Sequence, residues 1–278
     1  MLISGSADAS IIVWDAASGQ LLHKVNAHTR GILALALDPW SSWSTSGSLS
    51  DPLASAATAA GAEATGTASA ATTAAATSGN KQGSITLFSA DTTREIRVWS
   101  VSATGDITEQ SPTALVVAHE TSVYALRFDA DGDLWTASAD KTAKCLVRDR
   151  GWVEDTALAH PDFVRDVLVD EEGGWVLTAC RDEEVRVWER GTGKLWHTFT
   201  GHFEEVTALV LLGRKLVSVS IDATIRQWSL APQELQKARD EALKPKGEKE
   251  EEVVETKKSL LTEEEERELA ELMDDDDD

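Results

Sequence analysis

The chain has 278 residues, enough for one or two domains, and a formal net charge of −22. This acidic balance argues against direct binding to nucleic acid or to an anionic membrane, because both call for a basic surface. No stretch approaches the roughly 20 apolar residues of a membrane span, and the first residues lack the pattern of a signal peptide, so we expect a soluble protein of the cytoplasm or the nucleus.

The first predicted elements form one antiparallel strand pair. Residues 3–8 read as a strand that ends in a tight turn, and residues 11–14 read as its return. A Ser-Gly turn follows, after which "QLLHKVNAH" continues into a third strand. Only Met1 and Leu2 precede the first strand, so we expect the sheet to have no further strand on that side.

A low-complexity segment follows the strand "ILALALDP". Residues 41–82 are rich in Ala, Ser, Thr and Gly, and no large apolar residue occurs after Leu53. Such a composition buries too little apolar surface to offset the entropy lost on ordering. We therefore predict a disordered insertion, which is either neutral or phosphorylated on its Ser and Thr residues.

Four segments repeat one layout, and they begin with "AHTRGILAL", "AHETSVYAL", "AHPDFVRDV" and "GHFEEVTAL". In each segment an apolar residue lies four positions after the histidine. His160 follows His119 by 41 residues, and His202 follows His160 by 42. A period near 40 residues, with alternating strands and turns in each unit, indicates a repeated β-sheet unit.

Residues 231–278 form a charged tail that carries 8 of the 26 basic and 19 of the 48 acidic residues. Its first part, "APQELQKARDEALK", reads as a helix, and a capping-box pattern of Thr262 with Glu265 predicts a second, short helix near 262–273. One face of that second helix carries Leu269, Leu272 and Met273. The tail is either a solvated acidic segment or a short motif that folds into the groove of a partner.

The repeated residues resemble the WD-repeat family, whose four-stranded units form the blades of a β-propeller. The resemblance covers residues 1–40 and 83–230 and implies an all-β fold with about four and a half blades, part of the family's commonest ring of about seven. The first unit lacks an inner strand and the last unit lacks an outer strand. We therefore expect Met1 to be an internal methionine of a longer protein, so that this chain alone would self-associate. The alternative is a native partial propeller completed by a partner or a second copy.

In this family a buried network joins the histidine before each inner strand, a strand hydroxyl, the aspartate of the next turn and a strand tryptophan. Carried over to this sequence, the networks are His28 with Asp91 and Trp99; His119 with Asp140; His160 with Thr178, Asp182 and Trp188; and His202 with Ser218 or Ser220, Asp222 and Trp228. The first unit contributes Asp8 and Trp14. In the unit of His119, Arg148 stands in place of the tryptophan, so either that network is incomplete or Trp152 fills the space.

A histidine, a serine and an aspartate that meet in space can also indicate a hydrolase. The same trio repeats in every unit, however, whereas a catalytic site occurs once, and a buried imidazole between a carboxylate and a hydroxyl satisfies polar groups. The stretch "ERGTGK" at 189–194 lacks the full spacing of a phosphate loop. Cys145 and Cys180 fall within predicted strands, so we expect core thiols of a reducing compartment rather than a disulfide or a metal site. We predict no catalytic residues, no cofactor and no metal.

The face that carries the histidines and the aspartate turns is the expected contact surface for other proteins, because exposed aromatic and arginine side chains are favoured interface anchors. Its candidate binding residues, for each of which ordinary surface packing is the alternative, are Arg30, Tyr124, Phe163, Arg165, Arg181 and Phe203. The resemblance implies a non-enzymatic scaffold or adaptor that assembles a multiprotein complex. The alternative is a substrate receptor or regulatory subunit of an enzyme complex such as a ubiquitin ligase. The repeat ends "WDAA", "WSVS", "VRDR", "WERG" and "WSLA" lack the Trp-Asp-x-Arg pattern of ligase adaptors.

Overall fold

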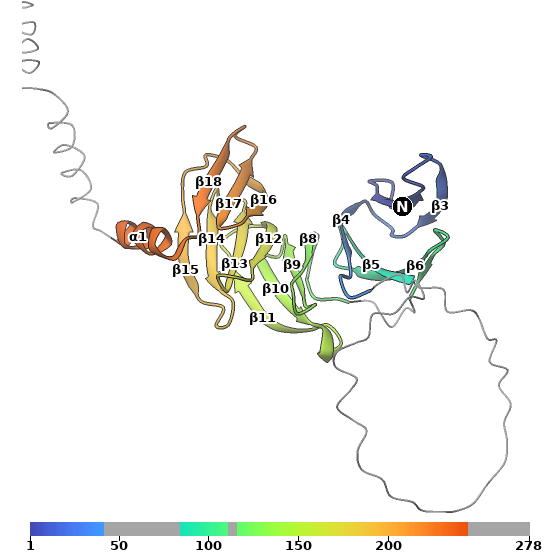
Figure 1. Cartoon of the computed structure of the whole chain (residues 1–278), viewed down its shortest axis with the longest axis horizontal. Helices are drawn as coiled ribbons and strands as arrows, with labels where there is room; N and C mark the ends of the chain where they lie inside the picture. Colours follow the sequence, from blue (N-terminus) through green and yellow to red (C-terminus); the bar gives the residue numbers. More distant parts are fainter. Residues whose placement is uncertain (42–83, 111–115, 244–278) are drawn as a thin grey trace, which may run out of the picture.

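The computed structural model describes residues 1–41, 84–110 and 116–243. These residues form five antiparallel sheets, which we number blades 1 to 5 in chain order (Figure 1). Blades 1 and 2 consist of β1 (Leu2–Gly5), β2 (Ser10–Trp14) and β3 (Leu21–Asn26), then β4 (Ile32–Leu37), β5 (Ser84–Asp91), β6 (Ile96–Ser102) and β7 (Ile107–Glu109). Blade 3 consists of β8 (Val123–Phe128), β9 (Leu134–Ser138), β10 (Thr142–Val147) and β11 (Val153–Ala159), with the short 3-10 helix η2 (Arg148–Arg150) before its last strand.

Blade 4 consists of β12 (Val164–Asp170), β13 (Trp175–Cys180), β14 (Val185–Glu189) and β15 (Leu195–Phe199). Blade 5 has three strands, β16 (Val206–Leu212), β17 (Lys215–Ser220) and β18 (Ile225–Ser229), and the helix α1 (Pro232–Leu243) follows it. The prediction of three strands in the first and the last unit is confirmed. β1 ends three residues earlier than predicted, because residues 6–9 already form the turn, closed by a 3.1 Å bond from the Ala9 N–H to the Ser6 carbonyl.

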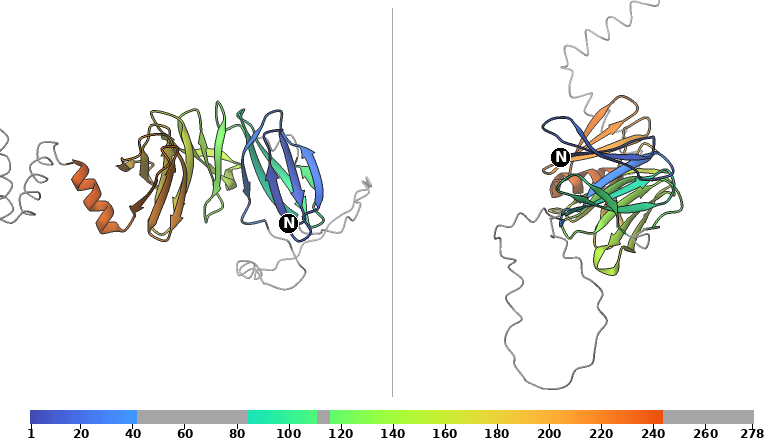
Figure 2. Two further views of the ribbon diagram at one scale, coloured as in Figure 1. Left: turned by 90° about the horizontal axis from the view of Figure 1, so that it is seen from above. Right: turned by 90° about the vertical axis from the view of Figure 1, so that its right-hand side faces the viewer.

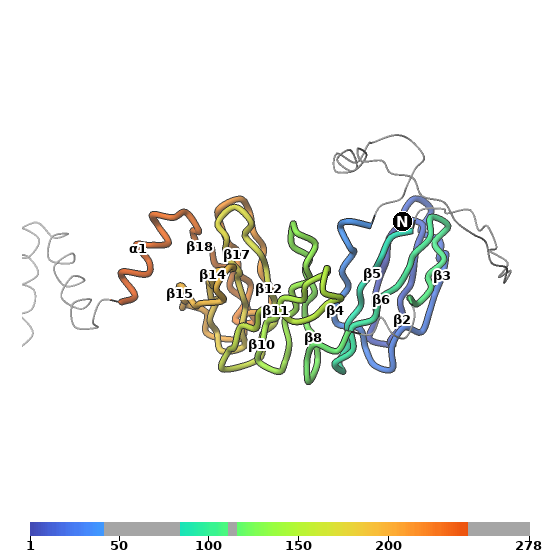
Figure 3. The backbone as a smooth tube through the Cα atoms, turned by 90° about the horizontal axis from the view of Figure 1, so that it is seen from below, coloured from blue at the N-terminus to red at the C-terminus, as the bar shows by residue number. Residues whose placement is uncertain are grey.

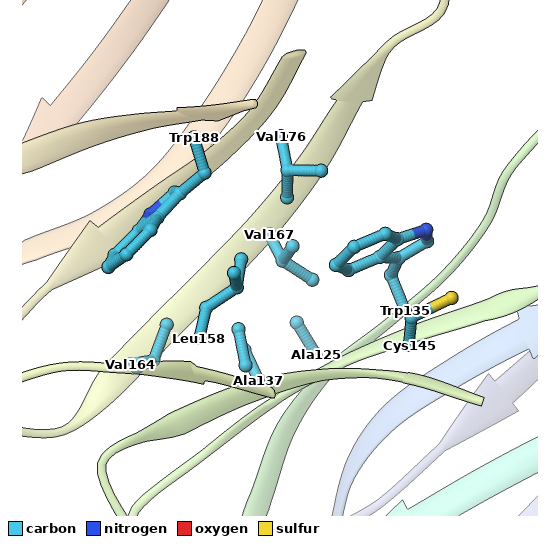
Figure 4. Packing of buried hydrophobic residues seen from close by; sticks show 10 residues of the cluster. Ala125, Trp135, Ala137, Cys145, Leu158, Val164, Val167, Val176 and Trp188 are labelled. Carbon is cyan, nitrogen blue, oxygen red and sulfur yellow. The ribbon is translucent and has the colours of Figure 1, made fainter. Parts of the chain in front are cut away.

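The blades pack face to face in chain order, and the described residues form an open row rather than a closed ring (Figures 2 and 3). The hydrophobic core is therefore divided into four clusters, one between each pair of neighbouring blades. Figure 4 shows the cluster between blades 3 and 4, where Trp135 and Leu158 meet Val176 and Trp188. Strands in the middle of the row, such as β13, are apolar on both faces because both faces are covered.

Each inner strand of blades 2 to 5 begins with the same irregularity. After its first residue the pairing with the second strand skips one position, as in a β-bulge. The skipped residues are Leu33, Tyr124, Arg165 and Thr207. Because a bulged residue has no partner across the ladder, its side chain is freed from the alternation of the strand.

The helix predicted at 231–244 is confirmed as α1, but it is not part of a separate tail. Leu235 is only 1% exposed and joins the core between blades 4 and 5. The guanidinium of Arg239 lies 4.0 Å from the ring centre of Trp196 on β15. The packed structure thus continues past residue 230, because α1 covers apolar surface at the outer side of blade 4.

Several predictions fall on residues outside the described part of the chain. These are the disorder of 41–82, apart from Ser41, and the helix near 262–273 with Leu269, Leu272 and Met273. Within 1–41, 84–110 and 116–243, no helix combines the length and the apolar character needed to cross a bilayer.

Candidate functional site

One face of the row is built from two kinds of connection, and we call it the histidine face. The first kind comprises the loops at 27–31, 118–122, 159–163 and 200–205, which lead into the inner strands and each contain a buried histidine. The second kind comprises the turns at 6–9, 92–95, 139–141, 181–184 and 221–224, which join β1 to β2 in blade 1 and the second to the third strand in blades 2 to 5. The alternation of strand and turn therefore brings the loop and the turn of a blade onto one surface, although they lie about 20 residues apart in the sequence of blades 3 to 5.

In blade 5 the predicted network is present, with Ser218 as its hydroxyl. The Ser218 Oγ lies 2.7 Å from the His202 Nε2 and accepts the Trp228 indole N–H at 2.8 Å. The His202 Nδ1 lies 3.1 Å from the Asp222 Oδ2. Ser220, the other candidate, is not in the network. It lies closer to the loop, where its hydroxyl donates to the Glu204 carbonyl.

Blade 3 has the histidine and the carboxylate but no tryptophan. The His119 Nδ1 lies 2.8 Å from the Asp140 Oδ2, and its Nε2 lies 2.7 Å from the Thr136 Oγ1. The tryptophans of blades 2, 4 and 5 stand ten residues after the hydroxyl, and that position here is Leu146, which pairs with Leu134 in the ladder. Leu146 rather than Arg148 therefore replaces the tryptophan, and the alignment to Arg148 was wrong.

Trp152 does not complete that network either. Its ring packs edge to face on Phe88 and Phe128, with centroid separations of 5.0 and 6.1 Å, and so strengthens the contact between blades 2 and 3. Arg148 serves the same contact. It makes a bidentate pair with Asp38, at 2.9 and 2.6 Å, across the boundary between the two blades.

In blade 4 the expected link between His160 and Asp182 is absent. The His160 Nε2 contacts the Thr178 Oγ1 at 2.8 Å, and the Trp188 indole N–H donates to the same hydroxyl. The His160 Nδ1 instead bonds the Leu158 carbonyl at 3.0 Å, while Asp182 accepts two bonds from Arg186. Arg186 outcompetes the imidazole because a guanidinium offers a carboxylate two charge-assisted bonds. Burial and the charge of Arg186 lower the pKa of His160 to about 4.

Blade 2 takes its carboxylate from a different position. His28 and Trp99 both reach the Ser89 hydroxyl, at 2.7 Å each, and the Asp91 Oδ2 lies 3.3 Å from the His28 Nδ1. Asp91 occupies the ladder position of Cys180 and Ser220, two residues before the usual turn aspartate. In blade 1 the Trp14 indole N–H donates to the Ser4 hydroxyl at 2.9 Å, and Asp8 accepts the Ser10 hydroxyl.

The chemistry of these networks is that of structural hydrogen bonding. In blades 2, 4 and 5 each hydroxyl is hydrogen-bonded to both an indole N–H and an imidazole nitrogen within the blade. Because the hydroxyl is also buried, a substrate cannot reach it for nucleophilic attack. Hydrogen bonds from Thr142, His119 and the Glu120 amide outweigh the opposing effect of burial and hold the pKa of Asp140 well below its usual range. Burial raises the pKa of Cys145 to about 12 and that of Cys180 to about 11, so both remain protonated thiols.

The predicted binding residues lie on the histidine face, and several of them contact one another. Tyr124 and Arg165 are both bulge residues, and the Arg165 guanidinium lies 4.2 Å from the Tyr124 ring centre. Arg165 also pairs with Glu205, so three blades are linked at this inner edge. These contacts make Tyr124 and Arg165 parts of the frame as well as of the surface.

The other predicted residues project further into solvent. The Arg181 guanidinium lies 5.2 Å from the Phe163 ring centre, and Arg30 is exposed. Phe203 is 72% exposed, and the Arg226 guanidinium lies 5.8 Å from its ring centre. The sequence analysis missed Ile221, which is 62% exposed on the neighbouring turn. A comparison of equivalent loop positions between the repeats would have found it.

Three stretches of the chain match the family described as WD domain, G-beta repeat, over residues 110–145, 154–189 and 193–229. An uncharacterized WD repeat-containing protein of Schizosaccharomyces pombe is 33% identical over 234 residues, which are 83% of this chain and 51% of the relative. The chain is a WD-repeat protein. The second and third matched stretches each contain the outer strand of one blade and the first three strands of the next, so the sequence repeat is offset from the blade.

Two further relatives of this WD-repeat protein match over shorter stretches. A chromatin assembly factor 1 subunit FAS2 homolog of Oryza sativa subsp. japonica is 28% identical over 55% of this chain and 33% of the relative. The tRNA (guanine-N(7)-)-methyltransferase non-catalytic subunit wuho of Drosophila pseudoobscura pseudoobscura is 34% identical over 38% of this chain and 28% of the relative. The chain spans about half or less of the length of these relatives.

Proposed function

We propose that this WD-repeat protein is a non-catalytic scaffold that binds other proteins through its histidine face. The observation that carries the proposal is the exposure of Phe203 and Ile221 on loops held by buried hydrogen bonds. Large apolar side chains on a rigid frame lose little conformational entropy on binding and gain by leaving water. The networks fix the loops, and the loop residues are the recognition elements.

The names of two relatives support a role within assemblies. One is a subunit of chromatin assembly factor 1, and the other is the non-catalytic subunit of a tRNA methyltransferase. We infer that this chain works without a cofactor of its own, in the cytoplasm or the nucleus. The free thiols of Cys145 and Cys180 are consistent with that location, because thiols stay reduced there.

A second candidate function is that of a regulatory subunit of an enzyme complex. The name of the fly relative favours it, because that protein is the non-catalytic partner of an enzyme. A substrate receptor of a ubiquitin ligase is one form of this function. The ends of the repeats argue against this form, because they lack the Trp-Asp-x-Arg pattern of ligase adaptors. The two candidates differ in whether the recovered complex contains a catalytic subunit.

Affinity purification of the chain followed by mass spectrometry tests the proposal. The test variant combines Arg30→Glu, Arg181→Glu and Phe203→Ser on the histidine face. The control variant combines Arg150→Glu, Lys194→Glu and Leu195→Ser, which are exposed residues away from that face. We expect partner proteins to be lost with the test variant and kept with the control. Equal recovery from both variants, or no enriched protein at all, would overturn the proposal.

A further inference from the structure

Blade 5 differs from the other blades at two exposed positions of the histidine face. The residue directly after the loop histidine is Thr29, Glu120 or Pro161 in blades 2 to 4, and it is Phe203 in blade 5. The residue three positions after the strand hydroxyl is Ala7, Thr92, Ala139 or Arg181 in blades 1 to 4, and it is Ile221 in blade 5. Only blade 5, among the described blades, places large apolar side chains at both positions.

Packing within the fold does not account for these two side chains. Blades 2 to 4 have a neighbour on both sides. In them the first position is exposed, and the second position is exposed in blades 2 and 4 (Thr92 and Arg181) and half-buried in blade 3 (Ala139). A further blade beside blade 5 would therefore leave the first position open to solvent and the second at least half-open. An apolar pair at positions that stay at least half-open in this repeat indicates a surface made for contact with another molecule.

Hydrogen bonds hold the loop that carries Phe203 beside the turn that carries Ile221. The Phe203 N–H donates to the Asp222 Oδ2 at 3.0 Å, and the Ile221 N–H donates to the Glu205 carbonyl at 3.2 Å. Two hydrogen bonds thus join the loop at 200–205 to the turn at 221–224. We call the exposed pair Phe203 and Ile221 the blade 5 patch. Its rigidity reduces the entropy that a partner must offset.

The charges around the blade 5 patch are mainly negative. The turn at 181–184 flanks the loop at 200–205, because Val185 pairs with Phe199 at the end of β15. The turn, the loop and their immediate contacts contain the carboxylates of Asp182, Glu183, Glu184, Glu204, Glu205 and Asp222 and the guanidiniums of Arg165, Arg181, Arg186 and Arg226.

Two of these carboxylates remain available to a partner. Arg165 pairs with Glu205, and Arg186 pairs with Glu184 and Asp182. Glu183 and Glu204 are exposed, and neither forms an ion pair with any described residue. Arg181 and Arg226 form no ion pair with a described residue either, so the balance is set by the six carboxylates and four guanidiniums, a net charge of −2. This net charge attracts a ligand that brings positive charge and repels an acidic one.

We propose that the blade 5 patch binds a segment of a partner protein in which a bulky apolar side chain is flanked by lysine or arginine. This inference rests on the proposed scaffold function and names the class of partner segment. The apolar side chain packs on Phe203 and Ile221, and the flanking cations face Glu183 and Glu204. Because these charges are exposed to solvent, salt weakens the binding.

The test follows backbone amide signals of the isotope-labelled full chain by NMR during addition of synthetic pentapeptides. The probes are Lys-Lys-Leu-Lys-Lys, its glycine counterpart Lys-Lys-Gly-Lys-Lys, and the acidic Glu-Glu-Leu-Glu-Glu. A site-resolved signal is needed because the acidic residues after Leu243 also attract lysine. We expect the leucine–lysine peptide to shift the Glu204 and Ala223 amides, more strongly at low salt, and both other peptides to shift them far less.

Four variants then assign the contacts. We expect Phe203→Ser with Ile221→Ser to weaken binding at these amides at least about tenfold, and Glu183→Gln with Glu204→Gln to weaken it and flatten its salt dependence. The matched controls, Leu195→Ser and Glu172→Gln, are exposed elsewhere and should leave binding unchanged. All four carry surface substitutions, and unchanged thermal unfolding verifies their fold.

Shifts confined to residues after 243, equal binding of the glycine peptide, or full binding to the Phe203→Ser, Ile221→Ser variant would each overturn the inference. The scaffold function would survive such a result if the purification still lost partners with the histidine-face variant. Conversely, peptide binding at the patch without any recovered protein would support the site and count against the scaffold.

Discussion

A single buried hydroxyl is the centre of each network that contains both a loop histidine and a tryptophan. In blades 2, 4 and 5 it accepts the indole N–H of a tryptophan and contacts the Nε2 of the loop histidine. Both nitrogens lie in the blade interior. There, leaving a polar atom without a partner costs more free energy than one hydrogen bond contributes to stability. The hydroxyl therefore ties the loop on the histidine face to the third strand of its own blade.

Ser218→Ala should lower the free energy of unfolding by about 1–3 kcal/mol, because it strips the His202 and Trp228 nitrogens of their shared partner. Thr136→Ala in blade 3 is the matched control, since His119 is the only side chain bonded to that hydroxyl, whose other partner is the Lys144 carbonyl, and Leu146 needs no bond. Urea unfolding monitored by tryptophan fluorescence measures both. Equal losses in the two variants would contradict a shared role for the hydroxyl.

Acid should weaken the fold through His160 before it protonates the carboxylates. The pKa of His160 drops from 6.5 to about 4 on folding, so the unfolded chain binds the proton first as the pH falls. The free energy of unfolding therefore decreases between pH 6.5 and 4, by on the order of 3 kcal/mol from this group. Urea midpoints measured across this range should fall more steeply for the native chain than for His160→Gln. Parallel slopes would assign the acid sensitivity to other groups.

At the scale of elements, the boundary between blades 2 and 3 depends on one arginine. Arg148 follows β10, donates from its Nε to the Gly132 carbonyl at 3.0 Å, and reaches Asp38 at the end of β4. Its guanidinium also lies over the rings of Trp40 and Trp152, at 5.5 and 5.1 Å from their centres. A planar, permanently charged group suits this site because it stacks and forms a bidentate pair at once.

Arg148→Lys should lower the free energy of unfolding by about 1–3 kcal/mol. An ammonium group keeps the charge but can neither form the bidentate pair with Asp38 nor stack on the tryptophan rings. Arg150→Lys is the matched control. Its pair with Asp155 lies largely in solvent, and we expect a loss below about 1 kcal/mol. A double-mutant cycle with Asp38→Asn isolates the pair. A coupling free energy near zero would show that the arginine acts only through the aromatic rings.

At the scale of the whole molecule, stability is distributed over the contacts between neighbouring blades. Each of the four hydrophobic clusters joins two adjacent blades, as in other repeat proteins whose units contact mainly their neighbours. The segment between β4 and β5 enters and leaves at one point, where the Asp38 N–H bonds the Thr86 carbonyl at 2.9 Å and the Ser41 hydroxyl accepts the Thr86 N–H. These two hydrogen bonds join the described ends of the segment directly.

Replacing residues 44–82 with a short Gly-Ser turn should therefore leave the melting temperature nearly unchanged. Each doubling of a flexible loop changes its closure free energy by only about 0.6 kcal/mol. Differential scanning calorimetry of the two chains, with Asp38, Ser41 and Thr86 intact, checks this expectation. A large drop in melting temperature or in soluble yield would mean that the replaced segment contributes packing.

The repeat and its strands could be predicted from the sequence because the period and the alternation are directly visible in it. The partners within each network were harder to predict. Spacing alone did not separate Ser218 from Ser220, and it did not show that Arg186 would take Asp182 from His160. The packing of α1 was also missed, because the charged residues around Leu235 resemble those of a solvated tail.

The bulge at the start of each inner strand presents a residue that the pairing of the strands does not constrain. Leu33, Tyr124, Arg165 and Thr207 stand at one structural position yet share neither size nor charge. Because the ladder skips this residue, a substitution there leaves the register of the strands intact. Mutations at these positions can thus change the surface of one blade without shifting its strands, although at Tyr124 and Arg165 they also change the contacts that link blades 3, 4 and 5.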